Sequence, residues 1–311
     1  MTGLLAAVFL GWALGANDAA NVFGPAIACR ALRYGVGVAT AAIFVLCGAL
    51  LGGGRALGTI GALGPQTHHS ALLVTVSAAA AMSALLVLRL PASSSQAVVG
   101  ALVGVALGRG TRFDAAGVTR LVLGWVLTPL GAALVSLLLA LGLSAWSRRR
   151  PSANLVLLDR LLRVALWGAG AWASFALGAN NAANVTGVFV GSGMLTTRQA
   201  GLVAGGSIAL GILTLGHRMM DLVGRDLVQL EPSTALVTML AQAFTVSAFA
   251  FLGVPVSTSQ AVAGGALGIG VAKGVRTIGR RTLMQILLGW IATPVGAGLL
   301  GWLAVHVAGP A

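Results

Sequence analysis

Charged residues are scarce in this sequence. Only 8% of the 311 residues are charged, whereas 58% are hydrophobic. A soluble domain needs far more charged surface, so the composition argues against a soluble fold and predicts an all-α integral membrane protein. Apolar runs such as residues 118–146 and 282–307 exceed the roughly 20 residues that cross a bilayer as a helix.

Acidic residues and cysteines are also few. Six acidic residues face 19 lysines and arginines, which gives a net charge of +13. Because the arginines lie mainly between apolar runs, we interpret them as residues of loops that face anionic lipid. We therefore expect no nucleic-acid partner. Cys29 and Cys47 give neither a metal-binding spacing nor a disulfide framework. HExxH and GxSxG motifs and paired intramembrane aspartates are missing, which disfavours a membrane-embedded enzyme.

The apolar segments form two series of five. The N-terminal segment lacks a basic n-region and runs into a polar cluster, so we expect a first membrane segment and not a cleaved signal peptide. The first series covers about 3–28, 36–57, 70–90, 92–107 and 118–146, and the second covers 164–190, 201–215, 234–252, 256–271 and 282–307. We therefore divide the chain into an N-terminal repeat (1–146), a basic linker (147–163) and a C-terminal repeat (164–311).

Landmarks in the second series copy those in the first. Asn181 lies 163 residues after Asp18, Arg218 lies 163 after Arg55, and Gln260 lies 164 after Gln96. Repeated halves are typical of secondary transporters, which place the substrate where the repeats meet. An odd number of crossings in each repeat would make the repeats inverted. The short segments 92–107 and 256–271 are expected to be re-entrant or broken hairpins.

The first repeated feature is the GAND motif, residues 15–22 (GANDAANV), with its copy at 178–185 (GANNAANV). Asp18 is the carboxylate that we expect inside the bilayer, where an acid indicates a functional site. Carboxylate and amide oxygens suit Na⁺, and the same carboxylate could instead hold a proton. The predicted cation-binding residues are Asp18, Asn21, Asn181 and Asn184, with Asp18 as the Na⁺ ligand if coupling uses sodium.

The second repeated feature is the serine motif, residues 91–97 (PASSSQA), with its copy at 255–261 (PVSTSQA). Proline followed by hydroxyl residues and an apolar run predicts a helix start. Unpaired N–H groups and the helix dipole make such a start an anion site, and two of them would form a cage for a small tetrahedral oxyanion. The predicted substrate-binding residues are Ser93, Ser94, Ser95, Ser257, Thr258, Ser259, Gln96, Gln260, Asn17 and Asn180.

Each feature also has a purely structural explanation. The asparagines could join helices, and the Ser/Thr runs could be ordinary caps. Asp18 could pair with Arg30 or Arg33. Arg55 and Arg218 are expected to snorkel, with anion steering as the alternative. The recurrence of both motifs in both halves favours a functional site.

The paired motifs GANDAANVFGPAIA and GANNAANVTG, with PASSSQAVVGALVG and PVSTSQAVAGGALG, resemble those of the inorganic phosphate transporter (PiT) family. The resemblance covers both halves. It implies inverted repeats, a multi-pass protein of the cell membrane, here a prokaryotic inner membrane, and a homodimer surrounded by lipid. It also implies no cofactor, Na⁺ or H⁺ as the coupling ion, and phosphate held between the GAND and serine motifs.

The chain departs from the family pattern at two kinds of position. Family members commonly carry aspartate in both GAND motifs, and often histidine where this chain has Gln96 and Gln260. Replacement of an acid by Asn181 weakens a cation site and makes sulfate more tolerable, because sulfate cannot donate a hydrogen bond to a carboxylate. We predict a phosphate symporter that works by alternating access. A sulfate permease, a passive anion channel and a membrane-embedded enzyme are the alternatives.

Overall fold

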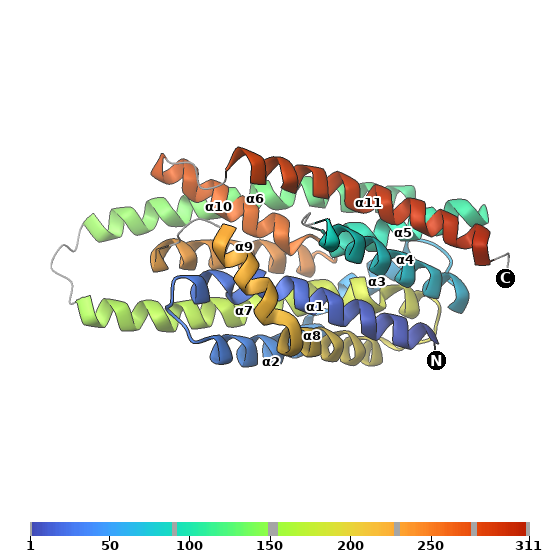
Figure 1. The fold of residues 1–311 in the computed structure, drawn as a ribbon, viewed down its shortest axis with the longest axis horizontal. Coiled ribbons are helices and arrows are strands. Elements are labelled where there is room, and N and C mark those ends of the chain that lie inside the picture. The colour runs from blue at the N-terminus through green and yellow to red at the C-terminus, as the bar shows by residue number, and fades with distance from the viewer. Residues whose placement is uncertain (1, 89–91, 149–154, 227–230, 275–278, 309–311) are drawn as a thin grey trace.

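The computed structural model describes residues 2–88, 92–148, 155–226, 231–274 and 279–308, and the regular structure in these ranges is helical (Figure 1). The helices are α1 (Thr2–Ala28), α2 (Tyr34–Gly52), α3 (Gly54–Ala62), α4 (His68–Val87), α5 (Ser94–Arg109), α6 (Ala115–Arg148), α7 (Leu155–Gly191), α8 (Thr197–Asp226), α9 (Pro232–Phe251), α10 (Thr258–Lys273) and α11 (Arg280–Ala308).

Eight of the described helices are long and apolar enough to cross a membrane, so the chain is a multi-pass membrane protein. The helices α5 and α10 are not among them, because each has 16 residues. At 1.5 Å per residue each spans about 24 Å, less than the ~30 Å hydrocarbon core. Both follow a proline-bearing serine motif, although Pro91 itself lies outside the described residues.

Two predicted boundaries differ from the structure. The expected segment 36–57 is wrong as a single helix, because α2 ends at Gly52 and α3 begins at Gly54. Three successive glycines weaken a helix, and Gly53 lies close to α7, where an added Cβ would be 3.0 Å from the Ala182 methyl group. Within the expected linker 147–163, residues 155–163 form the first part of α7.

The helices of one repeat pack on those of the other in a reciprocal way. The helix α1 packs on α8 as α7 packs on α2, and α5 packs on α11 as α10 packs on α6. The closest approaches correspond too: a Cβ on Gly15 would collide with the Ile208 carbonyl, and a Cβ on Gly178 with the Val45 carbonyl. In Figure 1, α1 and α7 run in opposite directions, as do α6 and α11. An inverted repeat requires this relation.

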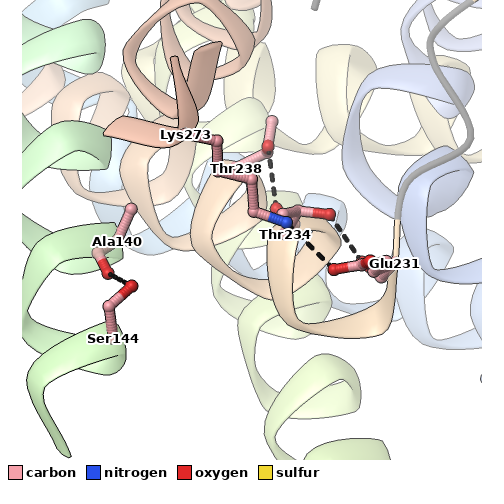
Figure 2. A network of polar contacts seen from close by, with 6 residues as sticks. All are labelled: Ala140, Ser144, Glu231, Thr234, Thr238 and Lys273. Atoms are coloured by element: carbon pink, nitrogen blue, oxygen red, sulfur yellow. Dashed lines mark hydrogen bonds and ion pairs between the residues drawn. The ribbon is translucent and has the colours of Figure 1, made fainter. Parts of the chain in front are cut away.

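Each repeat contains a hairpin of two helices, α4–α5 and α9–α10, with its base closed at matching positions. In Figure 2, the Lys273 ammonium donates to the Glu231 carboxylate over 2.9 Å. The Thr234 hydroxyl also donates to the Glu231 backbone carbonyl over 2.8 Å. At the positions 164 residues earlier, Arg109 donates to the Thr67 hydroxyl over 3.3 Å. The closed bases indicate that each hairpin is held as a unit.

Turns also recur in register. Gly110 and Gly274 end α5 and α10 in the left-handed conformation, with φ of 63° and 65°. Gly193 has φ of 72° after α7, and the residue 163 positions earlier, Arg30, has φ of 57° after α1. Arg30 is the non-glycine residue with positive φ in the described part of the chain. The second repeat thus uses glycine where the first keeps an arginine in a strained conformation.

Candidate functional site

The two GAND motifs meet through their fourth residues. The Asn181 amide nitrogen donates to Asp18 Oδ2 over 3.0 Å, although the residues are 163 positions apart. Both side chains are buried, at 3% exposure for Asp18 and 0% for Asn181. The predicted meeting of the two copies is therefore present in the structure.

The Asp18 carboxylate is surrounded by neutral donors. Its Oδ1 accepts from Asn17 over 3.0 Å and from Asn21 over 3.1 Å. The Thr258 side chain, from the first turn of α10, lies near the carboxylate. These amide and hydroxyl partners replace the loop arginines that we considered as alternative partners. A buried carboxylate held by neutral groups keeps its net charge available to a cation or proton.

Asn184 joins the second GAND motif to the start of α5. Its amide nitrogen donates to Asn181 Oδ1 over 2.8 Å and to the Ser94 hydroxyl over 3.3 Å. Ser94 comes from the first repeat, so this bond joins the second repeat to the first. Thr258 of the second repeat likewise lies near Asp18 of the first. The two helix starts are thereby tied to one central polar cluster.

Asn180 has a different set of partners. Its amide nitrogen donates to Asn181 Oδ1 over 2.9 Å and to the Val256 carbonyl over 2.7 Å. Its Oδ1 accepts from the Val256 N–H over 2.8 Å. The predicted substrate ligand Asn180 thus uses both amide hydrogens on protein groups in this conformation.

The serine motifs form the expected helix starts. Ser93 and Ser257 occupy the N-cap positions of α5 and α10, and Ser257 accepts from the Gln260 N–H over 3.3 Å. The hydroxyl of Ser93 contacts that of Ser95 at 3.3 Å, and the hydroxyl of Ser257 contacts that of Ser259 at 2.9 Å. All six predicted hydroxyl residues are buried except Ser259, which is half-buried.

Three buried amide oxygens of the predicted site have no hydrogen-bond partner: those of Gln96, Asn184 and Gln260. A buried acceptor without a donor costs free energy, and such groups in a native protein require an explanation. In the described part of the chain, no cluster of three or more His, Cys, Asp or Glu residues could hold a metal. A cation here would therefore take amide oxygens together with the Asp18 carboxylate.

One contact at this site and one away from it were not predicted from the sequence. Val256 takes part through its backbone, which residue type does not reveal, although its place directly after Pro255 is a usable signal. Arg55 donates to the Phe251 carbonyl over 2.7 Å and lies 4.3 Å above the ring of that residue. Its predicted counterpart, the side chain of Arg218, lies outside the described part.

A family profile described as the phosphate transporter family matches residues 14–301. The chain belongs to the phosphate transporter family. Members of this family are transporters and not enzymes, so the membrane-embedded enzyme is ruled out.

Relatives of this protein can be aligned with it over nearly its whole length. A putative phosphate permease of Methanocaldococcus jannaschii is 27% identical and covers 96% of this chain and 95% of its own length. The sulfate permease CysP of Bacillus subtilis is 27% identical, over 99% of this chain and 87% of its own. A probable low-affinity inorganic phosphate transporter of Rhizobium meliloti is 28% identical, over 99% and 96%.

A solved structure has the same fold as this family member. It is titled the sodium-dependent phosphate transporter, and it superposes with a TM-score of 0.82 at 20% identity. The match covers 99% of this chain and 98% of the other. At this identity the likeness establishes the fold.

Proposed function

We propose that the protein is a secondary transporter that moves inorganic phosphate together with a cation by alternating access. The observation that carries this proposal is the bond between Asp18 and Asn181. From Asn181, hydrogen bonds lead through Asn184 to Ser94 at the start of α5 and through Asn180 to Val256, just before α10. One network thus connects an acid to two sets of anion donors. The family membership supports the same substrate class.

The anion site is proposed at the starts of α5 and α10. Each start offers backbone N–H groups at the positive end of a helix dipole. The hydroxyl groups of residues 93–95 and 257–259 add donors from both repeats. A small tetrahedral oxyanion has acceptors on all sides, so donors from two directions suit it better than donors from one.

The coupling ion is proposed at Asp18. Oxygen ligands suit Na⁺, and Asp18 together with the orphaned amide oxygen of Asn184 supplies such ligands. A proton on Asp18 would equally neutralise the carboxylate. In either case the positive charge would offset repulsion between the carboxylate and the anion.

The orphaned amide oxygens of Gln96 and Gln260, predicted substrate residues, favour phosphate over sulfate. Hydrogen phosphate carries a proton at neutral pH and can donate it to a carboxylate or an amide oxygen, whereas sulfate has no proton to donate. Sulfate is the second candidate, because CysP is a relative and because Asn181 removes one acid from the site. The homodimer and the division into two repeats belong to the same proposal.

Uptake into proteoliposomes tests this function. Labelled phosphate should enter faster under an inward Na⁺ or H⁺ gradient than without one, and unlabelled phosphate should compete better than sulfate. Liposomes without protein provide the control. Gradient-independent flux would support a channel, preferential competition by sulfate would support the sulfate permease, and no uptake of either anion under any gradient would defeat the proposal.

A further inference from the structure

The tips of the two hairpins are held differently. In the second repeat, Asn180 makes two hydrogen bonds, of 2.7 and 2.8 Å, to the backbone of Val256, the residue before the N-cap of α10. Both residues are fully buried. Two bonds between one planar amide and one residue fix both the distance and the orientation of the start of α10.

The corresponding residues of the first repeat are Asn17 and Ala92. They lie 163 and 164 positions before Asn180 and Val256. Asn17 is half-buried and donates to Asp18 Oδ1, and the hydrogen bonds of the described residues do not join it to Ala92. The start of α5 is instead contacted by Asn184 from the other repeat, through Ser94.

The difference lies at the tips and not at the bases. The Glu231–Lys273 contact closes one hairpin as the Thr67–Arg109 contact closes the other. Two chemically equivalent asparagines therefore stand beside two equivalent hairpins, and one is engaged while the other is not. In an inverted repeat, exchanging the conformations of the two halves produces the opposite-facing state.

We propose that Asn180 and Asn17 are positioning residues that clamp the starts of α10 and α5 alternately. This inference rests on the proposed alternating access. In the conformation described here, Asn180 holds Val256 and Asn17 is released. In the opposite conformation, Asn17 holds the Ala92 backbone and Asn180 is released, so that its amide can face the anion. Each clamp fixes one of the two donor sets while the other set opens.

Cross-linking tests the alternation without any uptake measurement. In a Cys29→Ser, Cys47→Ser background, the pair Asn180→Cys/Val256→Cys and the pair Asn17→Cys/Ala92→Cys are combined in one chain. A short bis-methanethiosulfonate reagent joins cysteines that lie close together, and peptide mass spectrometry identifies the pair. We expect each molecule to carry one cross-link or the other. Both cross-links in the same molecule, or no 17–92 cross-link with phosphate, Na⁺ or low pH, would overturn the inference.

A second measurement follows the 17–92 cross-link alone, in a protein with leucine instead of cysteine at position 180. Asn180→Leu keeps the side-chain size but removes both bonds to Val256, together with the bond to Asn181 Oδ1, so it should favour the opposite state. Loss of two hydrogen bonds should raise the ratio of cross-linked to open Asn17→Cys/Ala92→Cys protein about tenfold. Thr186→Val is the matched control. It removes a buried hydroxyl from the same helix, and that hydroxyl forms hydrogen bonds to the Ala182 and Ala200 carbonyls and to neither hairpin.

The two outcomes separate this inference from the transport proposal. An unchanged or lower 17–92 cross-link ratio in the Asn180→Leu protein contradicts the alternate clamps, whatever the uptake assay shows. Mutual exclusion of the cross-links in a protein that transports neither anion would support the clamps and defeat the proposed function.

Discussion

The two repeats share their backbone packing and differ in their polar chemistry. Gly15 contacts Ile208 as Gly178 contacts Val45, and the same offset relates both pairs. Against this symmetry, Asp18 faces Asn181. The first repeat supplies the charge of the site, and the second supplies the amide that holds it.

This difference indicates how a duplicated scaffold can carry one negative charge in its site instead of two. Two aspartates at these positions would repel each other across the Asp18–Asn181 contact of 3.0 Å unless cations separated them. With one aspartate and one asparagine, the two side chains form a hydrogen bond instead. One positive charge is then enough to neutralise it.

Asp18→Asn is expected to have the largest effect, because it makes the two GAND motifs identical. Removing the carboxylate removes the proposed ligand of the coupling ion, and gradient-driven uptake should fall by at least about 100-fold. Proteoliposome uptake under a cation gradient checks this. The control is Asp159→Asn, which changes an exposed acid paired with Arg163. Normal gradient-dependent uptake in the Asp18→Asn protein would contradict the role assigned to Asp18.

Asn181→Asp tests the same difference between the repeats by giving both GAND motifs an aspartate. The new carboxylate would lie beside Asp18, and we expect a loss of roughly 2 kcal/mol in the absence of a bound cation. Na⁺ should restore that stability if the site binds sodium, whereas choline should not. Thermal unfolding in detergent with each salt measures the difference. Equal unfolding temperatures in both salts would exclude sodium as the ion held between the two residues.

Gly178→Ala tests the packing that the repeats share. The added methyl group would collide with the Val45 carbonyl, so a loss of about 1–3 kcal/mol is expected. Gly168→Ala is the control in the same helix, because a Cβ there meets nothing within 4 Å. That variant should keep or slightly raise the unfolding temperature, since alanine favours helix. An equal effect of the two substitutions would argue against the close contact.

The smallest effect is expected at the turn where the repeats differ in backbone strain. Arg30→Gly should stabilise the protein by about 0.5 kcal/mol, because glycine adopts positive φ without the Cβ conflict. Gly193→Ala makes the reverse exchange in open space and should destabilise by a similar amount. Unfolding temperatures compare the two, and a destabilised Arg30→Gly protein would show that Arg30 makes contacts that outweigh the strain.

The sequence allows much of the fold to be predicted because the apolar runs are long and the landmarks recur. Ten expected segments correspond to ten of the helices, and the two short ones correspond to α5 and α10. The division of 36–57 into α2 and α3 was missed, although the run Gly52 to Gly54 is a visible signal for a break. The helical start of α7 was missed because charge and proline dominate the local composition.

The sequence suggests the members of the candidate site but not their contacts. Duplication makes Asp18 and Asn181 equivalent positions of the two repeats, whereas their hydrogen bond is seen only in the structure. The clamp on Val256 involves backbone atoms, and the choice between Asn180 and Asn17 as the engaged residue depends on the conformation. Identical local sequence cannot distinguish two residues that exchange roles.

The most direct test of the account is a structure determined with phosphate and the coupling cation. We predict a tetrahedral ligand between residues 93–95 and 257–259 that accepts hydrogen bonds from both helix starts, with Asp18 on the cation side. A ligand bound by one repeat alone, or one located away from both serine motifs, would contradict the claim that the duplicated helix starts form a single anion site.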